Sequence, residues 1–207
     1  MSGFSIDDYY NYASGASRFR AMYINIANYR LYFSFGHLVA FEWGGTQYIS
    51  TENFGKRTEN HKTWIKNNHY GYSYNSLDDI EQGELEGMVS AQVLGVPYRC
   101  NFDFYSYAYN ANNSKYKAMC AVLGDFKLYY SYNTLIGFET PKAQYITEKH
   151  FSHTTQGHKY SARNWKKTPM RVQDSVLELI VLTNLLKLPF EEAKDVAGVH
   201  CERIHFS

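Results

Sequence analysis

The chain has 207 residues, enough for one large domain or two small ones with a sizeable hydrophobic core. Hydrophobic residues make up 44% of it and charged residues 20%, which is typical of a globular protein and excludes a largely disordered one. The formal net charge of +1 excludes a uniformly basic or acidic protein, although residues 1–97 carry −3 and residues 98–207 carry +4.

The first half of the chain predicts a β-meander followed by two helices. Alternating side chains predict strands at residues 17–26, 29–35, 38–42 and 47–50, with turn residues between them. A helix follows, for which Thr58 is the expected cap and His61 lies on the buried face. A second helix is expected from about Ser76 to Gly95, because Ser76 and Asp79 resemble a capping box.

The second half predicts the same elements in the same order. Thr155 is the expected cap of its first helix, and Thr168-Pro169 the expected start of the second. Pro189 ends that helix, and a short helix is expected to run from there to Gly198. The 17% of aromatic residues, mostly Tyr and Phe, also favours strands. The fold class expected is therefore α+β.

Residues 17–62 and 114–159 align without gaps at an offset of 97 residues. Of the 46 aligned positions 16 are identical, and most others exchange similar residues such as Arg and Lys. This predicts a tandem duplication with repeat units at residues 1–97 and 98–207. Because no low-complexity linker separates the units, we expect them to pack together with pseudo-two-fold symmetry.

No targeting or membrane segment is evident. The N-terminal residues lack the basic and apolar regions of a signal peptide, and the apolar stretch from Val176 to Leu188 is too short and polar to span a bilayer. The odd number of widely spaced cysteines, three in all, favours reduced thiols. We expect a cytoplasmic protein that needs no membrane.

Three histidines in the second unit, His150, His153 and His158, are close enough in sequence to ligate zinc or a redox metal. The first unit has Asn53, Lys56 and His61 at these positions, so only the last histidine is shared. We therefore expect ordinary loop histidines, no metal site and no cofactor. The sequence also contains no P-loop, HExxH, GxSxG or CxxC pattern, so no catalytic residues are assigned.

The shared pairs are Thr58 with His61 and Thr155 with His158. One interpretation is an anion site at a helix N-terminus. The other is a structural role, in which the histidine packs under the meander, and we favour it. A metal-dependent nuclease with a strand-strand-helix core is a third hypothesis, but no pair of acidic or amide ligands is shared by both units.

Basic residues predict a second kind of site. Basic character is kept along the strands of both units, and residues 149–171 add further cations with Tyr160 and Trp165 available for base stacking. The nucleic-acid-binding candidates are Arg18, Arg20, Lys115, Lys117, Lys159, Arg163, Lys166, Lys167 and Arg171. The alternative interpretation is that these residues only line solvated faces.

The segments Ser131-Tyr132-Asn133-Thr134, Tyr145-Ile146-Thr147 and His153 to His158 together resemble an uncharacterised domain family of phage and plasmid accessory proteins. That family has a Ser-Tyr-x-Thr strand, a hairpin and a Thr-Thr-x-x-His segment. The first unit departs from it, with Gly36-His37 and Arg57-Thr58 at the corresponding places. The resemblance implies a mobile-element setting in a bacterial host and assigns no chemistry.

The leading hypothesis is therefore a phage-encoded, non-enzymatic binding protein, of the kind that inhibits host defence, as anti-CRISPR proteins do. Its partner would be a host protein or ribonucleoprotein complex, bound through exposed tyrosines. A nucleic-acid-binding accessory protein is the alternative, and a metal-dependent nuclease ranks below it. The apolar helix at residues 176–186 leaves a homodimer open as well.

Overall fold

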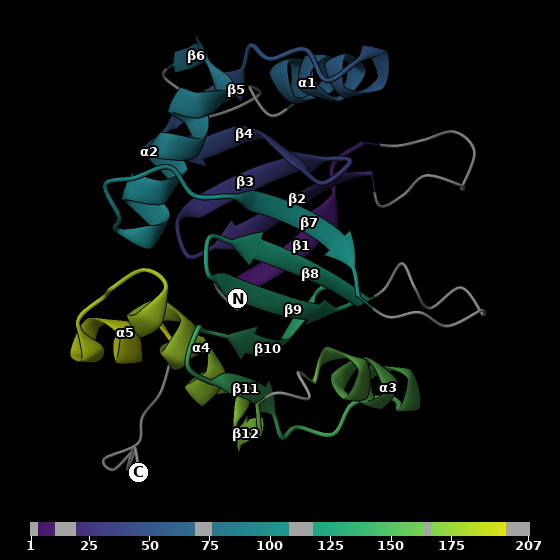
Figure 1. The fold of residues 1–207 in the computed structure, drawn as a ribbon, viewed down its shortest axis with the longest axis vertical. Coiled ribbons are helices and arrows are strands. Elements are labelled where there is room, and N and C mark those ends of the chain that lie inside the picture. The colour runs from purple at the N-terminus through teal and green to yellow at the C-terminus, as the bar shows by residue number, and fades with distance from the viewer. Residues whose placement is uncertain (1–3, 11–19, 69–75, 108–117, 164–166, 198–207) are drawn as a thin grey trace.

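The computed structural model describes residues 4–10, 20–68, 76–107, 118–163 and 167–197. Within them the chain forms two six-stranded sheets and five helices, an α+β arrangement as predicted (Figure 1). In this part of the chain no helix is long and apolar enough to cross a membrane.

The first sheet is built from consecutive strands. Five of them pair antiparallel, namely β1 (Phe4–Asp8), β2 (Ala21–Ile26), β3 (Tyr29–Ser34), β4 (His37–Trp43) and β5 (Thr46–Ser50). Helix α1 (Lys56–Asn68) then returns the chain so that β6 (Ser76–Ile80) pairs parallel to β5, and helix α2 (Gln82–Leu94) follows. A parallel pair needs such a crossover connection, which α1 supplies.

The second sheet repeats this order. Its strands are β7 (Phe102–Ser106), β8 (Ala118–Leu123), β9 (Phe126–Ser131), β10 (Thr134–Glu139), β11 (Gln144–Thr147) and β12 (Met170–Val172). Its helices are α3 (His153–Ala162), α4 (Asp174–Asn184) and α5 (Phe190–Val196). Even the β-bulges correspond, because Val39 in β4 and Ile136 in β10 are the extra residues of their hairpins.

The meander strands and the helix after them were predicted, and so was a second helix in each unit, but the predicted start of that second helix was wrong. Residues 76–80 form an edge strand, and α2 starts only after Glu81, which has extended backbone angles. In the second unit β12 precedes α4, which begins at Asp174 rather than near Thr168. Pairing with the neighbouring strand supplies backbone hydrogen bonds that local helix signals do not reveal. Gly95 ends α2 in a left-handed conformation, and α5 follows Pro189 as expected.

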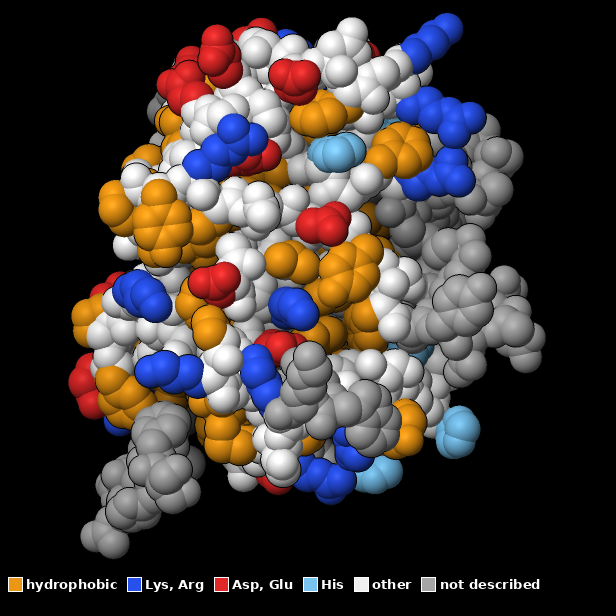
Figure 2. Space-filling model, in the orientation of Figure 1, with side chains coloured by type: hydrophobic (Ala, Val, Ile, Leu, Met, Phe, Trp, Pro, Cys, Tyr) orange, Lys and Arg blue, Asp and Glu red, His pale blue; other side chains and the backbone are white. Residues whose placement is uncertain are grey.

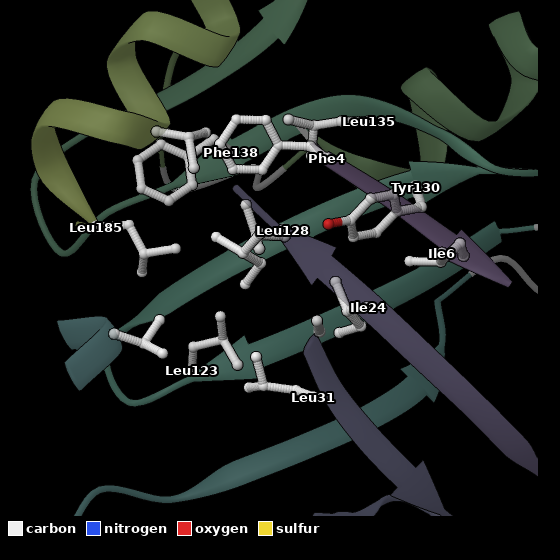
Figure 3. Close-up of a cluster of buried hydrophobic side chains, with 14 of the residues drawn as sticks. Phe4, Ile6, Ile24, Leu31, Leu123, Leu128, Tyr130, Leu135, Phe138 and Leu185 are labelled. Atoms are coloured by element: carbon white, nitrogen blue, oxygen red, sulfur yellow. The ribbon is translucent and has the colours of Figure 1, made fainter. Parts of the chain in front are cut away.

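The main core lies where the inner faces of the two sheets meet α2 and α4. Figure 3 shows Phe4 and Ile6 of β1 directed at Tyr130, Leu135 and Phe138 of the second sheet. Strand β1 contacts β10, and β4 contacts β7, so each sheet reaches across to the other with corresponding strands. A smaller apolar cluster lies between the first sheet and α1, and another between the second sheet and α3.

Candidate functional site

A serine, a threonine and a histidine meet where α1 packs on the first sheet. Ser34 is the last residue of β3, and Thr58 and His61 lie near the start of α1. The Ser34 hydroxyl donates to Thr58 Oγ1 over 3.0 Å, and its Oγ lies 2.8 Å from His61 Nδ1. One buried hydroxyl therefore joins the end of a strand to the first turns of a helix.

The second unit contains the same arrangement. Ser131 Oγ donates to Thr155 Oγ1 over 3.0 Å and lies 2.7 Å from His158 Nδ1. The predicted capping role of the threonines was wrong, because both helices begin two residues earlier. The cap of α3 is Ser152, whose side chain accepts a hydrogen bond from the Thr155 backbone N–H. The threonine hydroxyl instead bonds the serine. Both units keep this serine, but the sequence analysis did not connect it with the Thr–His pair.

An aromatic side chain covers each histidine. The Phe35 ring stacks on His61 at 5.5 Å between ring centroids and 10° between planes, and Tyr132 lies 6.0 Å from His158. Both residues have positive φ, 51° for Phe35 and 54° for Tyr132. This conformation costs an ordinary residue about 1–2 kcal/mol. Both units thus bear a backbone cost that places an aromatic ring over the histidine.

Burial decides what this cluster can do. Ser34 is 0% exposed and His61 1%, and burial lowers the pKa of His61 to about 4. The ring is therefore neutral near pH 7. A serine beside a histidine is the pairing found in nucleophilic catalysis, but a substrate must reach the serine oxygen. At these exposures none can, which supports the structural interpretation of both clusters.

A lysine next to each histidine strengthens the same junction. Lys62 is buried, and its ammonium donates to the carbonyl oxygens of Ser50 and Glu52 at 2.9 and 2.8 Å. Lys159 is buried in the same way and donates to the Lys149 carbonyl oxygen. These contacts tie each helix to the chain leaving the preceding strand.

A tyrosine–glutamate pair shared by both units was also missed by the sequence reasoning. Tyr32 donates to Glu42 over 3.0 Å, and Tyr129 donates to Glu139 over 2.7 Å. Both partners are identical in the two units, which was the signal available in the sequence. The shared polar side chains thus bond mainly to one another and to backbone within the fold.

The nucleic-acid-binding candidates divide into three groups. Arg18, Lys115, Lys117 and Lys166 lie outside the described residues. Arg20 lies 5.5 Å above the Phe35 ring, and Lys167 pairs with Glu139 at 3.1 Å. Neither residue lines the pocket that the remaining candidates share. The remaining three, Lys159, Arg163 and Arg171, line one pocket of about 240 Å³ between α3 and the β11–β12 edge.

The three histidines of the second unit do not converge. His150 and His153 are exposed, while His158 is buried against Ser131. Among the described residues no group of three or more His, Cys, Asp or Glu side chains could hold a metal ion. Cys100 and Cys120 are free thiols, and Cys201 lies outside the described ranges.

A groove of about 660 Å³ lies between the first sheet, the start of α2 and the segment leading into β7. Glu52, Glu81 and Glu86 line it, and Arg99, the one cation among the described residues of the lining, pairs with Glu86. Figure 2 shows further acidic side chains gathered nearby, over β6 and the start of α2. Besides Glu81, the exposed acids of β6 and the first turn of α2 are Asp78, Asp79 and Glu84. The groove is therefore open, polar and negatively charged.

Comparison of the chain with models of known protein families, with curated proteins and with solved structures yields no significant match. The resemblance to the phage and plasmid domain family therefore stays a prediction from the sequence.

Proposed function

We propose that this chain is a non-enzymatic binding protein encoded by a phage, and that it inhibits a host defence complex by occluding it. One observation carries the non-enzymatic part. The serine–threonine–histidine cluster that both units share is buried and bonded within the fold. In this proposal the serines and histidines of these clusters stabilise the fold, and the surface of the protein binds the partner.

In this proposal the two repeat units form the scaffold that carries the binding surface. The corresponding contacts of β1 with β10 and of β4 with β7 support two units related by a pseudo-two-fold axis. Such packing joins the two units through one apolar core. The outer surfaces are then free to diverge while the shared residues hold the architecture.

The acidic groove is the surface best suited to a protein partner. Its carboxylates favour a partner with exposed Lys or Arg, and complementary charge raises the rate of association. The rings of His37 and Phe54, stacked at 4.8 Å in its lining, add an apolar contact. We expect a basic surface, such as one that a nuclease complex uses to hold nucleic acid, to bind here.

The test is capture of a partner from bacterial lysate on the immobilised chain, compared between variants. Glu52→Lys and Glu81→Lys reverse two exposed charges of the groove and should abolish capture. Asp125→Lys makes the same reversal in the exposed β8–β9 turn and should not. Equal capture by all four proteins, or turnover of a substrate by the purified chain, would contradict the proposal.

Nucleic-acid binding is the second candidate function. The observation that favours it is the convergence of Lys159, Arg163 and Arg171 on one pocket. Salt-sensitive binding of DNA or RNA by the purified chain would support it, because phosphate contacts release counterions. Absence of binding at low salt would remove it.

A further inference from the structure

The pocket between α3 and the β11–β12 edge is strongly cationic. Its lining includes three cations, Lys159, Arg163 and Arg171, together with the polar side chains of His150, Gln156 and Tyr160. Among the described residues of this lining, Glu148 is the only acid. The volume of about 240 Å³ is several times the ~30 Å³ that one water occupies in the liquid, so a tetrahedral oxyanion fits.

Two donors in this pocket are buried without a hydrogen-bond partner. They are Arg163 Nε and Gln156 Nε2, and neither meets an acceptor among the residues that the structure describes. Buried donors nearly always have partners, because leaving one unmatched costs free energy. The residues that carry these atoms both line the pocket, so the lining contains polar groups that no described residue satisfies.

The surrounding charges also favour an anion. Burial lowers the pKa of Lys159, the nearby Asp174 raises it, and the positive charge of Arg171 lowers it further. Arg171 is close enough to repel the Lys159 ammonium, and an anion between them would relieve that repulsion. Asp174 is itself paired with Lys149 at 3.0 Å, which offsets much of its charge.

The first unit has an ion pair at the equivalent place. Asp79 lies opposite Ile49 in the parallel β5–β6 pair, and Arg171 lies opposite the equivalent Ile146 in the β11–β12 pair. Lys66 corresponds to Arg163 at the repeat offset of 97 residues. Lys66 and Asp79 form an ion pair with a shortest distance of 2.6 Å. Where the first unit neutralises its cation internally, the second presents two guanidinium groups.

We propose that the pocket between α3 and β12 is a binding site for a phosphate group, and that the phosphate belongs to a nucleic-acid strand. This assignment rests on the second function proposed above and names where that function would be exercised. Arginine suits the role because its planar fork of N–H groups matches phosphate oxygens. Tyr160 is 57% exposed at the rim, 5.7 Å from the Arg163 guanidinium, and offers a ring on which a base can stack.

The test measures binding of a fluorescently labelled 12-nucleotide single-stranded DNA by anisotropy at low salt, and of inorganic phosphate by calorimetry. Arg163→Gln and Arg171→Gln should each weaken DNA binding at least about tenfold, which is about 1.4 kcal/mol. The double variant R163K/R171D transplants the ion pair of the first unit. It should fold, because the first unit already accommodates that pair, and it should lose binding to a similar extent.

Two further variants complete the test, one as a control and one as a gain of function. Arg57→Gln removes one exposed cation from α1, outside the pocket, and should change the affinity by less than about twofold. Asp79→Arg replaces the acid of the first unit with the arginine of the second, and should create a second binding site for phosphate. Circular dichroism and thermal unfolding of each variant verify the fold.

The two binding measurements distinguish failure of the proposed phosphate pocket from failure of nucleic-acid binding as a function. Phosphate binding that needs Arg163 and Arg171, without DNA binding, would keep the pocket and assign it to a free phosphate compound, which overturns the nucleic-acid source. DNA binding that is unchanged in both arginine variants, or that falls equally in Arg57→Gln, would overturn the pocket and leave general nucleic-acid binding in place. DNA with and without a 5′-phosphate distinguishes a terminal from an internal phosphate.

Discussion

Acidification should destabilise the fold through His61. The ring has a pKa of about 4 when folded, because it is buried, and about 6.5 when the chain unfolds. The unfolded state therefore binds more protons than the folded state between these values. The contribution of this group to the free energy of unfolding is complete above pH 6.5, and it is lost as the pH falls toward 4.

The size of the effect follows from the two pKa values. At pH 5 the unfolded ring is almost fully protonated, whereas the folded ring is almost neutral. The size of the loss is set by the gap of about 1.5 units between pH 5 and the pKa of the unfolded ring. At about 1.36 kcal/mol per unit, the chain loses about 2 kcal/mol of stability between pH 7.5 and pH 5 through this residue.

Urea unfolding at the two pH values measures this loss, and His61→Asn isolates it. Asparagine keeps a polar atom near the Ser34 hydroxyl and does not titrate, so the variant should lose about 2 kcal/mol less than the natural chain over this range. His153→Asn makes the same substitution at an exposed position and serves as the matched control. Equal pH dependence in the natural chain and His61→Asn would refute the reasoning. So would an NMR titration of the folded protein with the His61 ring protonating near pH 6.5.

Three further substitutions test the internal bonds and the core. Ser34→Ala removes the hydroxyl that joins strand to helix and should lower stability by about 1–3 kcal/mol in urea unfolding, with partner and DNA binding retained. Tyr129→Phe leaves the buried Glu139 without its phenol donor and should cost a similar amount, and an unchanged midpoint would show that this bond does not stabilise the fold. Leu85→Ala, at a fully buried position of α2, should cost about 2–5 kcal/mol by thermal unfolding. A loss below about 1 kcal/mol there would place Leu85 outside the main core.

The meanders were predictable because their information is local. Alternating burial and short turns appear within a few neighbouring residues, as in β3 with Leu31 and Phe33 on the inner face. Strands β6 and β12 were not, because each is an edge strand whose partner lies about 25 to 30 residues earlier in the chain. Ser76 and Asp79 read as a helix cap on their own, and only the pairing with β5 makes them part of a strand.

The candidate site was predictable in kind but not in composition. Comparison of the two units singled out the histidines and threonines, which do lie together. It gave Ser34 and Ser131 no role, although Ser131 begins the Ser-Tyr-x-Thr segment, because the histidine partner of each serine lies 27 residues later in the chain. The pocket of the second unit required the strand register, since Arg171 has no counterpart until β12 is aligned on β6.

The two units share their buried polar networks and differ at exposed charged residues, and the phosphate experiment can test the reason for this difference. A buried polar network tolerates little change, because removing one member leaves the others unsatisfied, and both units keep theirs. An exposed ion pair such as Lys66–Asp79 contributes little to stability, typically below about 1 kcal/mol, so its replacement costs the fold little. The second unit could therefore acquire Arg163 and Arg171 without losing its structure. By the same argument, Asp79→Arg should give the first unit a phosphate site at almost no cost in stability, and a large destabilisation by that substitution would contradict it.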